Sequence, residues 1–244
     1  MISLSSRTIK GMRDLKPVFA GRPGAGNRPL AARLATLAAP AAGRDALDIG
    51  CGEGELVRLL RGAGARALGL DTSGETLERA RAAGTPIVRG DALRLPFRDA
   101  SFDLAACSLV LHYLERPGRA LLEIARVLRP GGRLVLADRV CSSERRLRSA
   151  QDRIEWLRNP VLEALRSGED LLALLLRSGF RVRSAEEAEV SGSVEEWIAG
   201  AEDVRAAALR AELDRRGDFD LGGLRIEGAE LRLRVAVFVA ERSS

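Results

Sequence analysis

Hydrophobic and polar residues follow two periods along the first part of this chain. Short apolar runs predict buried strands; they lie at 46–49, 66–70, 86–89, 102–107 and 133–138. Between them, apolar residues recur every three or four positions and predict amphipathic helices, at 55–62, 74–83 and 118–129. Another helix is expected from Leu30 to Ala39, because Pro40 ends it. Regular alternation of strand and helix indicates an α/β fold, with a parallel sheet covered by helices on both faces.

The pattern changes after Val140. Residues 142–178 have helical periodicity that is interrupted by Asn159-Pro160 and by Ser167-Gly168. A strand is expected at 180–183 and a further helical stretch at 193–216. Near the end, residues 230–240 alternate at first and then become apolar throughout, which predicts a buried final strand.

A glycine-rich turn follows the first strand and carries the most specific chemistry. Asp48 lies in that strand, and every second residue of the turn is glycine: Gly50, Gly52 and Gly54. Glycine lets the backbone approach a ligand closely, and the next helix offers free N–H groups at its start. A dinucleotide site requires G-x-G-x-x-G, but Glu55 stands where its third glycine would be. The turn therefore favours an adenosine with a cationic tail over a nicotinamide dinucleotide.

Further polar residues follow the next strands. Asp71 ends the second strand, where an acid accepts hydrogen bonds from ribose hydroxyls, and Asp91 follows the third. The fourth strand leads into Ser108 and then His112 and Tyr113, the single histidine and the single tyrosine of the chain. The carboxyl ends of parallel strands meet at one edge, so these residues are expected to surround one ligand.

Five motifs together resemble class I S-adenosylmethionine-dependent methyltransferases, particularly the small-molecule enzymes of ubiquinone and menaquinone biosynthesis. The motifs are LDIGCGEG, GLDTS, GDALRLPF, FDLAACSLVLHYL and ALLEIARVLRPGGRLVLAD, within a resemblance that runs from about Leu34 to Val140. It implies a Rossmann-like, seven-stranded, mostly parallel sheet with an antiparallel last strand and helical lid insertions. It also implies S-adenosyl-L-methionine as cofactor and S-adenosyl-L-homocysteine as product. The implied cofactor-binding residues are Asp48, Gly50, Cys51, Gly52, Gly54, Asp71, Thr72, Asp91, Ala92 and Ser108.

One domain over residues 1–244 accommodates all of these segments. We expect an N-terminal cover and helix at 1–40, a cofactor-binding core at 41–140, helical lid segments at 141–178 and 191–217, and terminal strands at 218–244.

The methyl acceptor is expected to meet the first residues after the fourth strand. Imidazole titrates near neutrality, so His112 could accept a proton, but a purely structural role in an apolar turn is the favoured interpretation. The resemblance places a substrate lid after Val140, so the expected substrate residues are His112, Tyr113, Arg139, Trp156 and Trp197. Either tryptophan could stack on a ring or anchor the lid to the core.

Composition and charge restrict the kinds of molecule that this chain is expected to bind. The net charge is +5, but the arginines alternate with acids on helices and aromatics are few, which disfavours a nucleic-acid partner. There is no apolar run of ~18 residues to span a membrane and no apolar signal core at the N-terminus. Three cysteines without metal-ligand or disulfide spacing predict no metal site and fit a reducing cytoplasm. Either a monomer or a homodimer is compatible with the chain.

Two other enzyme classes stay open. The same fold can bind the cofactor without transferring its methyl group, as in a cyclase or a decarboxylase. An RNA or DNA methyltransferase is less favoured, because enzymes that modify base amines typically show a proline-aromatic tetrad where this chain has Asp103-Leu104-Ala105-Ala106. The leading hypothesis is methyl transfer to an O, N or C nucleophile of a small molecule, by in-line displacement.

Overall fold

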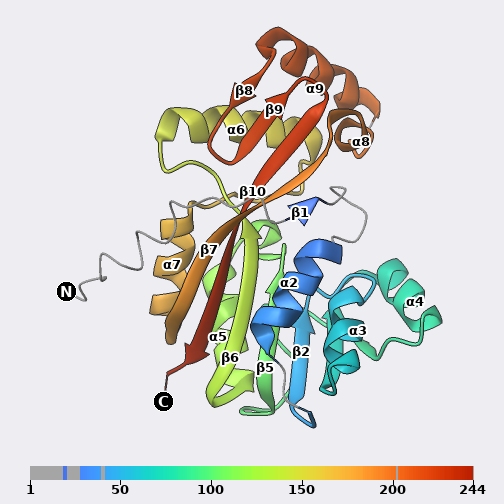
Figure 1. Cartoon of the computed structure of the whole chain (residues 1–244), viewed down its shortest axis with the longest axis vertical. Coiled ribbons are helices and arrows are strands. Elements are labelled where there is room, and N and C mark those ends of the chain that lie inside the picture. The colour runs from blue at the N-terminus through green and yellow to red at the C-terminus, as the bar shows by residue number, and fades with distance from the viewer. Residues whose placement is uncertain (1–18, 21–27, 40–41, 202, 244) are drawn as a thin grey trace.

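The computed structural model describes residues 19–20, 28–39, 42–201 and 203–243. It contains a ten-stranded sheet with helices on both faces and a smaller cap at one end (Figure 1). The expected N-terminal cover lies largely outside the described residues.

Seven strands form the central sheet, in the order β4-β3-β2-β5-β6-β10-β7. Strands β2 to β6 are mutually parallel, whereas β10 lies antiparallel between β6 and β7. This confirms the predicted sheet and its antiparallel last strand. The bounds are β2 Asp45–Ile49, β3 Arg66–Asp71, β4 Ile87–Arg89, β5 Phe102–Ser108, β6 Leu128–Arg139, β7 Phe180–Ser193 and β10 Glu230–Arg242. Three short strands complete the ten: β1 Phe19–Ala20, β8 Phe219–Asp220 and β9 Leu224–Glu227.

Helices bury an apolar stripe against each face of this sheet. On one face, α5 and α7 share a core with β5 and β6 that includes Leu121, Ile124 and Leu175. On the other face, α2 and α3 bury Leu34, Val57 and Leu60. The bounds are α2 Arg28–Ala38, α3 Glu55–Gly62, α4 Gly74–Ala82, α5 Pro117–Val127 and α7 Gly168–Arg177, with a 3₁₀ turn η1 at Leu111–Tyr113. Helix α7 comes from the segment expected to be lid, yet it belongs to the layer that covers the sheet.

The cap consists of α6 (Arg145–Arg158), α8 (Val194–Ile198), α9 (Asp203–Arg216), β8 and β9, with the ends of β7 and β10 that reach them (Figure 1). It has its own apolar core, built around Ile154, Trp197, Leu209 and Leu224. Helix α6 follows β6 along the chain, so the cap stands over the carboxyl ends of the parallel strands. The helical stretch expected at 193–216 is two helices, because a turn separates α8 from α9.

Strand β7 is much longer than the predicted 180–183. Its second half contains Glu186, Glu187 and Glu189, and such an acidic pattern is not typical of a buried strand. The whole segment pairs with β10 instead, and arginines neutralise the acids: Glu186 pairs with Arg33 at 2.7 Å and Glu187 with Arg234 at 3.6 Å. Long-range pairing therefore overrides the local pattern.

Candidate active site

The turn after β2 uses its three glycines for different purposes. All three have positive φ angles, of 69°, 52° and 78° at Gly50, Gly52 and Gly54, a conformation that other residues rarely adopt. A Cβ at Gly50 would lie 2.2 Å from Val110 Cγ2, and one at Gly54 would lie 2.5 Å from Thr85 Cγ2. A Cβ at Gly52 would meet nothing within 4 Å. Two glycines are therefore required by packing, and the third faces open space where a ligand can approach the backbone.

Asp71, at the end of β3, holds this turn in place. Its Oδ2 accepts a hydrogen bond from Gly52 N and its Oδ1 accepts one from Ser73 N, each at 3.0 Å. The carboxylate is half-buried and retains lone pairs for a further donor. Thr72 beside it is exposed. The predicted ribose acceptor thus lies directly against the open glycine.

Asp48 and Cys51 are buried below the same turn. Burial, and then the nearby charge of Asp71, raise the pKa of Asp48 to about 8. Cys51 directs its sulfur into the sheet, since a Cβ at Gly69 would lie 2.6 Å from Cys51 Sγ. Only the backbone of Cys51 is therefore available to a ligand.

Replacing Asp48 with asparagine is expected to stabilise the protein more at high pH than at low pH. The native state holds the Asp48 proton more tightly than the unfolded state, whose pKa is about 4, so stability falls as pH rises from about 4 to about 8. Relative to the wild type, D48N should gain at least about 1.4 kcal/mol between pH 5 and pH 9, the equivalent of one pKa unit. Urea denaturation of both proteins measures this, and a difference independent of pH would contradict it.

The turn after β4 continues this edge of the sheet. Gly90 N donates to Asp71 O at 3.0 Å, so the two turns lie side by side. Asp91 is exposed and its Oδ1 accepts from Leu93 N at 2.8 Å, whereas Ala92 is buried in the main core. Of this predicted pair, only Asp91 offers a side chain to solvent.

Strand β5 leaves the sheet through a strained residue. Leu109, directly after Ser108, has a φ of 59°, in the left-handed region that suits glycine. Its N–H donates to Ala137 O on β6 at 2.8 Å, which holds this conformation. Such strain is concentrated at functional sites, and it directs the chain into η1.

His112 in η1 is almost fully buried and is bound to Asp138 near the end of β6. Its backbone N–H donates to Asp138 Oδ2 at 3.1 Å, and its Nδ1 pairs with Asp138 Oδ1. The Tyr113 ring lies 4.2 Å away, between centroids, and is 44% exposed. His112 is therefore fixed through one ring nitrogen.

Arg139 joins the sheet to the cap. Its guanidinium forms a two-point ion pair with Glu155 on α6, with Nη1 at 3.1 Å from Oε2; the Glu155 side chain is fully buried and the Arg139 side chain is 11% exposed. Its backbone N–H donates to Asp138 at 2.8 Å. His112 and Arg139 thus both contact Asp138, with Tyr113 beside His112, and their binding of a substrate stays a prediction.

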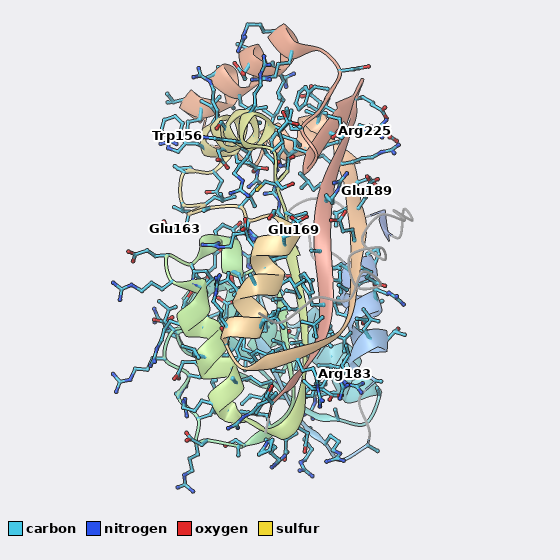
Figure 2. All side chains as sticks on the ribbon, turned by 90° about the vertical axis from the view of Figure 1, so that its left-hand side faces the viewer. Trp156, Glu163, Glu169, Arg183, Glu189 and Arg225 are labelled. Carbon is cyan, nitrogen blue, oxygen red and sulfur yellow. The ribbon has the colours of Figure 1, made fainter. Side chains whose placement is uncertain are left out.

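The two tryptophans lie elsewhere. Trp197 is buried in the core of the cap, and Trp156 is 58% exposed, beneath Arg205 at 4.8 Å from its ring centroid. Figure 2 shows Trp156 on the cap and Glu163 below it, where the cap meets the sheet. Because Trp197 is 1% exposed within the core of the cap itself, its ring packs against other cap residues.

Residues 47–136, which run from β2 to β6, match a family model described as a methyltransferase domain. This core is a methyltransferase domain.

Curated relatives support the same assignment. The O-methyltransferase resE of Aspergillus sclerotiorum is 36% identical over 64% of this chain and 60% of its own length. A demethylmenaquinone methyltransferase of Corynebacterium kroppenstedtii is 38% identical over 41% of this chain and 43% of its own length. The chain thus spans about 60% or less of the length of these relatives. The predicted resemblance to menaquinone-type methyltransferases is confirmed.

Among solved structures, an S-adenosylmethionine-dependent methyltransferase from Mesorhizobium loti has a TM-score of 0.58. It is 26% identical, and the match covers 86% of this chain and 96% of that one. Nearly the whole length of that enzyme therefore superposes on this fold. The predicted fold class is confirmed.

Two residues of the candidate site were not predicted from the sequence, Asp138 and Glu155. Asp138 was not singled out, although it ends the last matching motif, and acids at strand ends had been the signal elsewhere. Glu155 gave no local signal, because its importance depends on Arg139 reaching α6.

A hollow of about 430 Å³ lies at the opposite ends of the strands. Arg44, Asp103, Arg129 and Arg133 line it. Arg44 and Arg129 both pair with Asp103, at 3.0 and 2.7 Å. Since its charges are satisfied and it lies far from the glycine turn, we do not assign the site to it.

Metal-ligand clusters, cysteines and membrane spans were sought among the described residues. No group of three or more His, Cys, Asp or Glu among them is arranged to hold a metal ion. The three cysteines are free and buried. No helix in the described part of the chain has the length and apolar character that crossing a bilayer requires.

Proposed function

We propose that this chain transfers a methyl group from S-adenosyl-L-methionine to an oxygen atom of a small molecule. One observation carries the proposal: the open backbone of Gly52 lies against the Asp71 carboxylate. This contact stands beside the point where the strand order reverses between β2 and β5, which is where open α/β sheets bind nucleotides. Oxygen is chosen because the relative resE is named an O-methyltransferase.

The residues present fit this cofactor. Ribose hydroxyls can donate to the Asp71 carboxylate while its two backbone contacts persist. Asp48 lies below the turn with a raised pKa, and a nearby cation would favour its ionised form. The bound cofactor supplies an electrophilic methyl group on a positively charged sulfur, and the protein supplies position and proton transfer.

His112 is the residue placed to move the acceptor's proton. With Nδ1–H donating to Asp138, the other ring nitrogen, Nε2, carries a lone pair and can accept a proton from a hydroxyl group. Asp138 fixes the ring and stabilises the charge that forms on it. His112 is 3% exposed, so little water reaches its ring.

Replacing Asp71 with alanine tests cofactor binding. The variant loses the ribose acceptor and also leaves Gly52 N and Ser73 N without their partner, so S-adenosyl-L-homocysteine should bind at least about 100-fold more weakly. Isothermal titration calorimetry measures the affinity. The exposed acid Glu78 on α4 provides the control, since Glu78→Gln should bind as the wild type does. Equal affinity in D71A and the wild type would contradict the assignment.

Product analysis separates methyl transfer from the alternative of a cyclase or decarboxylase of the same fold. Mass spectrometry of reactions with a panel of phenols and hydroxy acids should show S-adenosyl-L-homocysteine formed together with a product heavier by one methylene unit. A rearranged product with the cofactor unchanged would support the alternative.

A further inference from the structure

Helix α6 turns an unusually polar face toward the interior of the protein. Gln151, Glu155 and Arg158 are four and three positions apart, so they lie on one side of the helix. Gln151 and Glu155 are fully buried. Both side-chain polar atoms of Gln151 lack a hydrogen-bond partner, which buried amides ordinarily have. This face is therefore better suited to a polar ligand than to a closed apolar core.

Arg158 is the cation on this face that has no countercharge. Arg139 and Glu155 neutralise each other in their two-point pair. Within the described part of the chain, no carboxylate lies in ion-pair range of Arg158, and its buried Nε has no hydrogen-bond partner. Burial, and then the charge of Arg139, lower the pKa of Arg158 against the opposing effects of Glu155 and Tyr113. An additional anion would compensate this guanidinium.

The surroundings of Arg158 place it beside the candidate active site. Its guanidinium carbon lies 5.9 Å from the Trp197 ring centroid, and a Cβ at Gly200 would lie 2.9 Å from Nη2. Arg158 lies one helical turn after Glu155, which pairs with Arg139 next to Asp138. The chain that follows Arg158 returns to the candidate site, where Glu163 N donates to His112 O at 3.0 Å. Arg158 thus lies at the end of the cap helix that contacts the candidate site.

We propose that Arg158 binds an anionic group of the methyl acceptor, so that the substrate is a hydroxy acid whose carboxylate is held by the cap. This inference rests on the proposed function and names its substrate class. The planar guanidinium matches a carboxylate in a two-point contact. The unpartnered amide of Gln151, two turns earlier on the same face, can bind another polar group of the same substrate. A carboxylate held there would direct the hydroxyl of the same molecule toward His112.

Paired ligands that differ only in charge test this. The protein loaded with S-adenosyl-L-homocysteine is titrated by calorimetry with 4-hydroxybenzoate and with 4-hydroxybenzamide. In the wild type, the carboxylate should bind at least about 10-fold more tightly than the amide. Arg158→Gln should abolish this preference, and Arg158→Lys should retain part of it because the charge remains without the fork. Arg153→Gln is the matched control, because Arg153 is exposed on the same helix.

The outcomes separate this inference from the proposed function. A preference for the carboxylate that persists in R158Q, or that is absent from the wild type, overturns the role of Arg158. S-adenosyl-L-homocysteine should bind R158Q as tightly as the wild type, which also shows that the variant is folded. Failure of that ligand to bind the wild type would refute the cofactor assignment instead, and the carboxylate preference of the unloaded protein still tests Arg158.

Discussion

Replacing His112 with glutamine is expected to lower kcat by about 10²–10⁴-fold while leaving cofactor affinity unchanged. Glutamine fills much of the same volume but cannot accept a proton from a hydroxyl at neutral pH. The backbone contacts of residue 112 persist, because its N–H donates to Asp138 and its carbonyl accepts from Glu163 N at 3.0 Å. Single-turnover measurements with a methylatable hydroxy acid, together with calorimetry for S-adenosyl-L-homocysteine, give the two quantities.

Asp138→Asn provides the companion variant. It keeps one of the two oxygens that accept from His112, replaces the other with an amide donor and removes the charge that stabilises the protonated ring, so kcat should also fall, by no more than in H112Q. Because the two residues act as a pair, the double variant should lose little more than H112Q alone. Full activity in H112Q would instead assign His112 a structural role.

Replacing Arg139 with methionine should destabilise the protein by about 3–5 kcal/mol, because it leaves the fully buried Glu155 without its countercharge. The loss should be larger than for a surface pair, where water already solvates both charges. Urea denaturation followed by circular dichroism measures the difference. If the cap unfolds separately from the sheet, the loss will appear in the transition of the cap.

The double variant R139M/E155L separates charge from packing. Removing both charges should recover most of the stability that R139M loses, since apolar side chains of similar volume replace a buried pair at little cost. The control is Arg210→Gln, which breaks the exposed pair between α9 and Glu195 and should have little effect. A double variant as unstable as R139M would show that the loss comes from packing rather than from the uncompensated charge.

Much of the parallel sheet could be read from local patterns. The apolar runs at 46–49 and 102–107 became β2 and β5 to within a residue, because a strand buried on both faces requires continuous apolar sequence. The glycine turn could also be predicted, since positive φ angles at Gly50, Gly52 and Gly54 restrict the residue type. In contrast, the second half of β7 was missed because its acids are compensated by arginines on other elements.

In the candidate site, too, local motifs could be predicted and contacts between distant residues could not. Asp71 was predicted because a local motif places an acid at a strand end, whereas the pairing of His112 with Asp138 joins residues 26 positions apart. Trp197 and Trp156 carried the same sequence signal, yet one is buried in the cap and the other faces solvent. Such differences depend on which face of each element meets a neighbour.

The sequence by itself determined the alternation of strands and helices, the glycine turn and the acid that holds it, because backbone conformation and strand burial are specified by neighbouring residues. Only the tertiary structure decided which distant side chains meet. It paired Arg139 with Glu155, fixed His112 through Asp138 and left Arg158 without a countercharge beside them. These contacts depend on how the cap packs onto the sheet, and packing is a property of the whole chain rather than of any segment.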